Sequence, residues 1–252
     1  MTDLPPPIPA ATLVLMRQPR SGPPELLMME RPGHMAFAAG ALVFPGGRIE
    51  PQDAATAATL AQGSEEEAAK IAAIRETIEE TGVAAGLVPE PAPDLVARLR
   101  EGLLAGEDFA PLIEQAGVAL DLDALVPFAR WCPNFKETRR FDALFFIARA
   151  PASSPGPTAQ AGEAARVFWA SAARTIEEVD AGRAHAIFPT RRNLERLAGF
   201  ASFEEALADA RRHEVRTITP WVERREGRDW VCIPADAGYP VTAEPLETAR
   251  RR

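Results

Sequence analysis

Three glutamates within residues 75–83 are the side chains of this chain best suited to chemistry. The segment reads RETIEETGV, which places Glu76, Glu79 and Glu80 at relative positions i, i+3 and i+4. On an α-helix these positions share one face, with neighbouring side chains roughly 5–6 Å apart. Like charges at that spacing repel each other unless a cation lies among them, and clustered carboxylates suit a hard divalent ion such as Mg²⁺. The pattern predicts a metal-binding face on a helix.

The sequence around the glutamates supplies the helix that must carry them. Ser64 followed by Glu67 is typical of a capping box, and Gly82 stands where a C-terminal glycine is expected. The core-facing stripe consists of isoleucines at helical spacing, namely Ile71, Ile74 and Ile78. We therefore expect a helix from about residue 65 to 81.

A glycine turn precedes this helix, and together they resemble a known family. Residues 44–50 read FPGGRIE, where glycines would let the backbone approach a phosphate. The segment from Gly47 to Val83 resembles the Nudix hydrolase signature, G-x5-E-x7-R-E-U-x-E-E-x-G-U with U apolar, and its second half matches at every specified position. The resemblance implies that Glu76, Glu79 and Glu80 bind Mg²⁺ or Mn²⁺ with Arg75 as their organiser. It also makes Glu79 the leading choice for the catalytic base.

The first half of the signature departs from the family pattern. Six residues after Gly47 the chain has Asp53 in place of Glu, and Asp53 lies 22 residues before Arg75 where the signature has eight, so 14 residues are inserted. Glu67 does stand eight residues before Arg75, but its place in the capping box is the simpler account. Either Asp53 or Glu67 could replace the first glutamate of the signature.

The segment before the turn bears on substrate choice. Arg31, Gly40 and the FPGG turn resemble the coenzyme A diphosphatase branch of the family, although that branch expects a second arginine where this chain has Ala36. By this resemblance Arg31, Gly46, Gly47 and Arg48 bind substrate. An ordinary amphipathic loop is the alternative for residues 31–44.

Two further positions outside the signature could serve the reaction. Arg139 and Arg140 begin a predicted strand and could hold the substrate's phosphates, although Arg140 and Asp142 could instead form a structural ion pair. Glu163 precedes another strand, in a region from which many Nudix enzymes recruit an extra metal ligand or the base. A solvated turn glutamate is the other interpretation.

The remaining pattern predicts an α/β protein with the Nudix-type α/β/α sandwich, a mixed sheet and helical insertions. Strands are expected at residues 10–16, 25–30, 41–44, 128–131, 141–148 and 165–169, and a hairpin at 221–223 and 229–233. Both faces of the strand at 141–148 should be buried. Residues 54–63 should form a surface turn of helix and residues 93–127 a helical insertion. Thr190 and Ser202 are candidate N-caps. We expect one domain over 10–244, a Pro-rich disordered start at 1–9 and a flexible tail at 245–252.

Composition limits the function classes. The 252 residues carry a formal net charge of −8, which argues against a nucleic-acid partner. There is no run of 18 apolar residues to cross a membrane, and Cys132 and Cys232 lack metal-site spacing, so a cytoplasmic protein with reduced thiols is expected. A homodimer would also fit this kind of protein.

The function that these patterns favour is metal-dependent hydrolysis of a nucleoside diphosphate linked to another moiety. Coenzyme A or an acyl-coenzyme A is the first choice of substrate. ADP-ribose, NADH, nucleotide sugars and oxidised nucleoside triphosphates are alternatives. A non-catalytic nucleotide sensor is the alternative of another class, but such domains commonly lose helix glutamates, and here all three and Arg75 are present.

Overall fold

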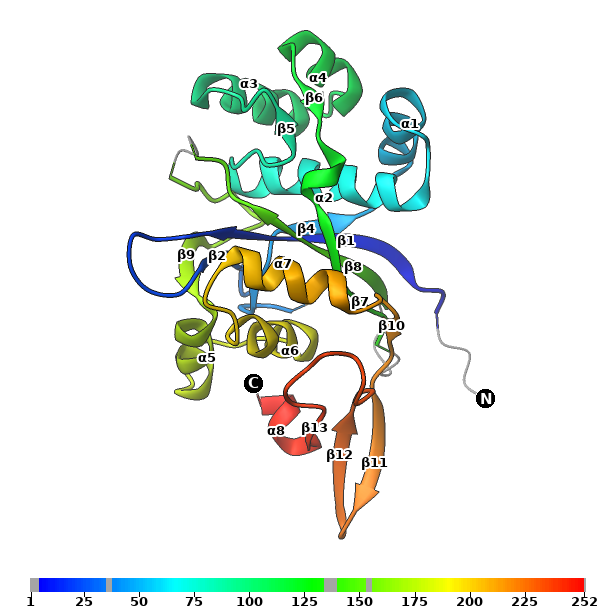
Figure 1. The fold of residues 1–252 in the computed structure, drawn as a ribbon, viewed down its shortest axis with the longest axis vertical. Coiled ribbons are helices and arrows are strands. Elements are labelled where there is room, and N and C mark those ends of the chain that lie inside the picture. Colours follow the sequence, from blue (N-terminus) through cyan, green and yellow to red (C-terminus); the bar gives the residue numbers. More distant parts are fainter. Residues whose placement is uncertain (1–4, 35–37, 134–139, 153–155, 252) are drawn as a thin grey trace.

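A mixed β-sheet forms the centre of the molecule (Figure 1). The computed structural model describes residues 5–34, 38–133, 140–152 and 156–251. β1 (Ile8–Arg17) runs parallel to β8 (Phe141–Arg149), from Ile8 opposite Phe141 to Met16 opposite Arg149. The other strands of this sheet are β2 (Glu25–Glu30), β3 (Leu42–Val43), β4 (Gly46–Arg48), β7 (Val126–Trp131), β9 (Arg166–Ser171) and β10 (Thr217–Ile218). β4 pairs with β1 and β9 pairs with β2.

Strand alternation divides the hydrophobic core into two layers, one on each face of the sheet. Along β1, Leu13 and Leu15 enter one core cluster, and Val14 and Met16 enter the other. β8 alternates in the same way, so the expected burial of both its faces is confirmed.

Helices cover both faces, which gives the expected α/β/α sandwich (Figure 1). One layer holds α1 (Pro51–Leu60), α2 (Glu65–Thr81), α3 (Pro93–Leu104) and α4 (Phe109–Ala116), with the short strands β5 (Leu87–Val88) and β6 (Ala119–Leu120) and a 3₁₀ turn at Leu122–Ala124. The other holds α5 (Ala172–Asp180), α6 (Phe188–Leu197) and α7 (Phe203–Arg212). The range 93–127, where we expect a helical insertion, contains α3, α4 and the 3₁₀ turn.

The C-terminal part forms a small separate sheet with one short helix. β11 (Trp221–Arg225) and β12 (Arg228–Cys232) make the expected hairpin, and Glu226 and Gly227 both have positive φ in its turn. β13 (Ala243–Pro245) adds to β12, and α8 (Leu246–Arg251) follows. The flexible tail that we expected from residue 245 is thus a strand end and a helix, because residues 243–245 continue a hydrogen-bonded sheet.

Three local expectations need correction. β1 begins at Ile8, inside the segment expected to be disordered, because Ile8 N–H donates to the Arg140 carbonyl and the Pro9 carbonyl accepts from Ile49 N–H. Helix α1 begins at Pro51, before the start expected at residue 54, because a capping box of Glu50 and Asp53 starts the helix there. Thr190 is not an N-cap.

Helix α6 begins earlier than the Thr190 cap would require. Its N-cap is Ile187, and Pro189 lies in the first turn, where its missing N–H costs no hydrogen bond. The Ser202 cap of α7 is confirmed by a hydrogen bond from Glu205 N–H. Both cysteines are buried, unpaired thiols. Within the described ranges, no helix has the length and apolar character needed to span a bilayer.

Candidate active site

Helix α2 is the platform of the candidate site, and its sequence fixes both of its ends. Ser64 Oγ accepts from Glu67 N–H at 3.2 Å, and the Glu67 carboxylate accepts from Ser64 N–H at 2.8 Å. Gly82 closes the helix in the left-handed conformation, with φ of 68°. The interpretation of Glu67 as a cap is confirmed: it lies eight residues, or roughly 12 Å of helix, before Arg75.

Asp53 is the acidic partner that holds Arg75 in place. The Arg75 guanidinium donates from Nε to Asp53 Oδ1 at 2.9 Å and from Nη2 to Oδ2 at 3.0 Å, and Nη2 also donates to the Arg48 carbonyl at 3.2 Å. Asp53 is fully buried and Arg75 is 2% exposed. Asp53 also accepts from Glu50 N–H at the start of α1. The residue six positions after Gly47 therefore organises Arg75, as a bidentate ion pair.

Arg75 in turn orients two of the three glutamates. Its Nη1 lies 3.0 Å from Glu76 Oε1 and 3.0 Å from Glu79 Oε1. The third, Glu80, instead accepts from Gly46 N–H through Oε2 at 2.9 Å. The three carboxylates of α2 are thus held in two ways. The Arg75 guanidinium binds Glu76 and Glu79, and the Gly46 amide binds Glu80.

The glycine turn lies directly against these carboxylates. A Cβ atom on Gly47 would stand 2.3 Å from the Glu76 carboxyl carbon. A Cβ on Gly46, whose φ is +153°, would stand 2.3 Å from the Ala11 carbonyl oxygen. Both glycines are required by close approach, the first to a side chain and the second to the β1 backbone.

The pKa values of the three glutamates are raised, because burial and the neighbouring negative charges outweigh the nearby positive charge. Burial raises the pKa of Glu76 to about 7, and the charge of Glu79 adds to the rise. Burial also raises the pKa of Glu79, and it raises the pKa of Glu80 well above its ordinary value, with the charge of Glu76 contributing. Burial alone would lower the pKa of Arg75, but the hydrogen bond to Asp53 and nearby carboxylates raise it. The glutamates would therefore gain from a further cation.

The donor set fits a hard divalent ion. Glu76 and Glu80 present carboxylate oxygens to one cavity, and Arg75 forms an ion pair with Glu76, whereas Glu80 accepts from the Gly46 amide. Among the described residues, no three carboxyl, imidazole or thiol groups already surround a single point as a metal cluster. Glu79 faces Arg75 and is not among the residues that line the cavity.

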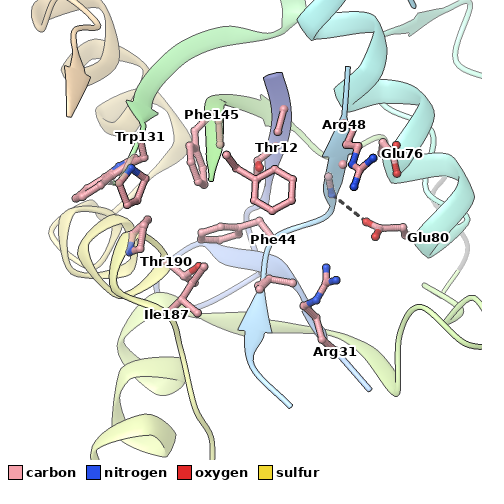
Figure 2. Close-up of a pocket in the computed structure, with 18 of the residues that line it drawn as sticks. Thr12, Arg31, Phe44, Arg48, Glu76, Glu80, Trp131, Phe145, Ile187 and Thr190 are labelled. Carbon is pink, nitrogen blue, oxygen red and sulfur yellow. Dashed lines mark hydrogen bonds between the residues drawn. The ribbon is translucent and has the colours of Figure 1, made fainter. Parts of the chain in front are cut away.

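A cavity of about 600 Å³ joins this acidic edge to an aromatic end (Figure 2). Gly46, Gly47 and Arg48 line it beside Glu76 and Glu80, and Phe44 lies between the two ends. The aromatic end is built by β7, β8 and the start of α6, through Trp131, Phe141, Phe145, Ile187, Phe188 and Pro189. The shape suits an elongated ligand with a charged part and a flat or apolar part.

The structure brings most of the predicted substrate residues to this cavity. Arg31 and Arg140 both line it, and in each the Nε atom is buried without a hydrogen-bond partner. Arg140 does not pair with Asp142, whose carboxylate is bound by Arg130 at 2.7 and 2.8 Å, so the alternative of an Arg140–Asp142 pair is wrong. Arg139 lies outside the described residues.

Glu163 also lines the cavity, from the turn before β9. Its charge contributes to the raised pKa of Glu76, Glu79 and Glu80, so its carboxylate is close to the helix glutamates. Glu163 N–H donates to the Gln160 carbonyl at 3.3 Å, which closes the turn. The residue is exposed, as a turn glutamate would be, yet it faces the site.

Sequence reasoning missed two parts of the site. The first is the aromatic end, because the sequence predicts a strand end at Trp131 and a helix cap at Thr190 but no cavity wall at either. The second is Arg100 on α3, which donates from Nε to the Glu79 carbonyl at 2.9 Å. An arginine next to the buried Leu99 carries no signal in the sequence that would distinguish it from the exposed Arg98.

Among solved structures, the architecture of this chain is similar to that of a Nudix hydrolase. A Nudix hydrolase from Alicyclobacillus acidocaldarius matches with 28% identity and a TM-score of 0.70, over 82% of this chain and 97% of that one. A C. elegans Ap4A hydrolase binary complex matches with 16% identity and a TM-score of 0.42, over 77% and 99%. A MutT protein from Methanosarcina mazei Go1 matches with 17% identity and a TM-score of 0.41, over 77% and 96%. No protein-family model and no curated protein matches the chain.

Proposed function

We propose that this Nudix-type hydrolase cleaves the diphosphate linkage between a nucleoside and another moiety, with Mg²⁺ or Mn²⁺ as cofactor. The observation that supports it best is the convergence of two kinds of group on one cavity. Glu76 and Glu80 offer oxygen ligands at one edge, and the buried, unpartnered Nε atoms of Arg31 and Arg140 offer donors in the same space. A divalent cation and guanidinium groups can together neutralise the charge of a diphosphate.

The residues of the cavity would have different roles in this reaction. Glu76 and Glu80 would hold the metal, whose chemistry is to neutralise phosphate oxygens and to acidify water, and Glu79, which faces Arg75, is the third candidate ligand. Glu79 or Glu163 would accept the proton of the attacking water. As the water oxygen bonds to one phosphorus, the bridging oxygen leaves with the other phosphate, and two monophosphates result. Arg31 and Arg140 would bind the phosphates and stabilise the charge of the leaving group.

Coenzyme A or an acyl-coenzyme A is the substrate that we propose first. The FPGG turn with Arg31 supports this choice, and the cavity has an apolar end of aromatic residues that could receive the organic part of such a ligand. Ala36, where the branch has an arginine, argues against it. ADP-ribose, NADH and nucleotide sugars share the diphosphate and are the next candidates. We also propose that the protein is cytoplasmic and forms a homodimer; light scattering of the pure protein tests the dimer.

The first experiment is product analysis by mass spectrometry after incubation with Mg²⁺ and a panel of these compounds. We expect coenzyme A to give 3′,5′-ADP and 4′-phosphopantetheine, and EDTA to stop turnover. Cleavage of another diphosphate instead would reject the coenzyme A assignment and keep the mechanism. Tight nucleotide binding without cleavage of any compound would reject catalysis in favour of a sensor.

Substitution of the two arginines tests their place in the reaction. Arg31→Met and Arg140→Met should each raise KM by about tenfold, because each removes a charge-assisted contact to phosphate. Arg20→Met is the matched control, since Arg20 is exposed on the loop after β1, away from the cavity. A rise in KM for coenzyme A alone supports the proposed substrate. If KM is unchanged for every substrate, these arginines do not bind phosphate.

A further inference from the structure

The helical insertion contributes a side chain that reaches the catalytic helix. Arg100 projects from α3 to the C-terminal end of α2, where the last carbonyls of a helix lack partners within the helix. Its Nε donates to the Glu79 carbonyl at 2.9 Å, and its Nη2 donates to the Glu80 carbonyl at 3.4 Å. The two residues of α2 that Arg100 contacts are two of the three candidate metal ligands. A guanidinium at this end of a helix is also favourable to the helix dipole.

The same guanidinium binds a second segment of the chain. Arg100 Nη1 donates to Thr158 Oγ1 at 2.6 Å, and Nη2 donates to the Thr158 carbonyl at 3.0 Å. Thr158 begins a stretch that we call the Glu163 segment, residues 158–165. Arg100 thus connects three parts of the chain that are far apart in sequence.

The Glu163 segment is also hydrogen-bonded to α2 through its backbone. Thr158 N–H donates to the Thr81 carbonyl at 2.9 Å, and Gln160 N–H donates to the Glu80 carbonyl at 3.1 Å. The Gln160 carbonyl then accepts from Glu163 N–H and Ala164 N–H, at 3.3 and 3.1 Å. Arg100, Glu80, Gln160 and Glu163 are therefore linked in turn by hydrogen bonds.

Arg100 and Thr158 pack closely against Gly82. A Cβ atom on Gly82 would lie 3.2 Å from both Arg100 Nη1 and Thr158 Oγ1. Burial lowers the pKa of Arg100, which agrees with a guanidinium held between two elements rather than in solvent. The neighbouring Arg98 is exposed on the same helix.

We propose that Arg100 is a positioning residue, which fixes the Glu163 segment to the end of α2 and so sets Glu163 beside the helix glutamates for the reaction. The proposal rests on the proposed function, because Glu163 has a role only if this cavity catalyses hydrolysis. It gives the insertion at 93–127 a part in catalysis. Arg100 itself does not line the cavity and touches no reacting atom.

The test combines amide exchange with a double-mutant cycle. Arg100→Met keeps the apolar stem and removes the guanidinium, and Arg98→Met is the matched control on the same helix. In Arg100→Met we expect the amides of Thr158 and Gln160 to exchange about tenfold faster or more, because they belong to a segment that has lost its anchor. In Arg98→Met the exchange of both amides should match that of the wild type.

Turnover then decides whether the anchor serves Glu163. We expect Arg100→Met to lower kcat by about tenfold with little change in KM, and Glu163→Gln to lower kcat by about 100-fold. In the Glu163→Gln background, Arg100→Met should cost less than about twofold, because there is no carboxylate left to misplace. Stability of each variant is measured by thermal denaturation, so that a folding defect is recognised.

Several results would overturn the proposal. If the two losses in kcat multiply, Arg100 acts through something other than Glu163. If Glu163→Gln retains full kcat, or if exchange at Thr158 and Gln160 is unchanged in Arg100→Met, the positioning role is wrong. Absence of turnover in the wild type would reject the proposed function itself, and amide exchange would then decide alone whether Arg100 holds the segment.

Discussion

The ion pair of Asp53 and Arg75 lies in the protein interior, where a charged group costs free energy because it has lost its water. Both side chains are almost fully buried, and removing one partner of such a pair typically costs about 3–5 kcal/mol because the other is left uncompensated. A purely structural helix would gain more from apolar packing at this position. Arg75 is instead a fixed donor to Glu76 and Glu79, so the buried pair serves to orient carboxylates.

Glu80 gives a prediction at the same scale. Its pKa in the folded protein is raised well above the ordinary value of 4.5, first by burial, so the folded chain binds this proton more tightly than the unfolded chain. Stability from this group is therefore present at low pH and is lost as pH rises from about 4.5 through the folded pKa. At pH 8, without divalent ions, Glu80 therefore destabilises the fold, because its carboxyl group ionises more readily in the unfolded chain than in the folded one.

Glu80→Gln should therefore raise the melting temperature of the metal-free protein at pH 8, by about 3 °C or more, and abolish turnover. The amide oxygen can still accept from Gly46 N–H. Near pH 4 the gain should vanish, because the wild-type carboxyl is then protonated in both states. Glu65→Gln is the control: Glu65 is exposed in the first turn of the same helix, where a negative charge is favourable. Calorimetry at both pH values is the measurement, and a lower melting temperature for Glu80→Gln at pH 8 would refute the explanation.

At the scale of elements, local signals were enough to predict α2 but not its surroundings. The capping box of Ser64 and Glu67 and the glycine at 82 lie within the helix or next to it, so the predicted bounds of 65–81 are those of the structure. The partner of Arg75 lies 22 residues away on α1 and is reached only when two helices pack. No local pattern records such a contact.

The aromatic end of the cavity could not be predicted for the same reason. It is formed by Trp131 on β7 and by residues 187–190 at the start of α6, which are distant in sequence and meet on one face of the sheet. Helix α6 also has no side-chain cap at Ile187, so the usual start signal is missing there and the sequence points to Thr190 instead. The sequence predicts the acidic edge and also Arg31, Arg140 and Glu163, which line the cavity, but it does not predict the aromatic wall.

The contact between β4 and α2 yields the element-scale prediction. In Gly47→Ala the new methyl group would overlap the Glu76 carboxylate, which is the mobile end of a side chain, so Glu76 should move while the fold persists. We expect the Mg²⁺ concentration for half-maximal activity to rise by about tenfold or more, with a melting temperature close to that of the wild type. Activity is titrated against Mg²⁺ in both proteins.

Gly33→Ala serves as the control for this substitution, since a Cβ atom there would meet nothing within 4 Å. An unchanged Mg²⁺ requirement in Gly47→Ala would mean that Glu76 does not bind the metal in the position described. Loss of the fold in Gly47→Ala would mean that the backbone, rather than the carboxylate, had to move.

At the scale of the whole molecule, the C-terminal segment reaches back to the cavity wall. Trp131 Nε1 donates to Tyr239 Oη at 3.1 Å, and the Tyr239 hydroxyl donates to Asn193 Oδ1 at 2.7 Å. The Trp131 ring makes edge contacts with Phe188 at 5.9 Å and with Tyr239 at 5.5 Å between centroids. One buried phenol therefore links the sheet, helix α6 and residues after the hairpin, and it fixes the indole that lines the cavity.

Tyr239→Phe should weaken this link measurably. Two buried polar groups, on Trp131 and Asn193, would lose their partner, and we expect the free energy of unfolding to fall by about 2 kcal/mol in urea at pH 8. KM should also rise while kcat changes less, because the Trp131 ring is no longer held by a hydrogen bond at the aromatic end of the cavity.

The pH dependence of the same variant separates the hydrogen bonds from simple packing. Burial raises the pKa of Tyr239 to about 12 from an ordinary value of 10, so the wild type loses stability as pH rises between these values, and Tyr239→Phe should lack that loss. Tyr239 is the only tyrosine of the chain, so absorbance of the phenolate reports its titration directly. A titration midpoint near 10 in the folded protein would show that the phenol is not buried in the network. A stability difference that is independent of pH would contradict the linkage, because it would leave only the lost packing and hydrogen bonds to explain it.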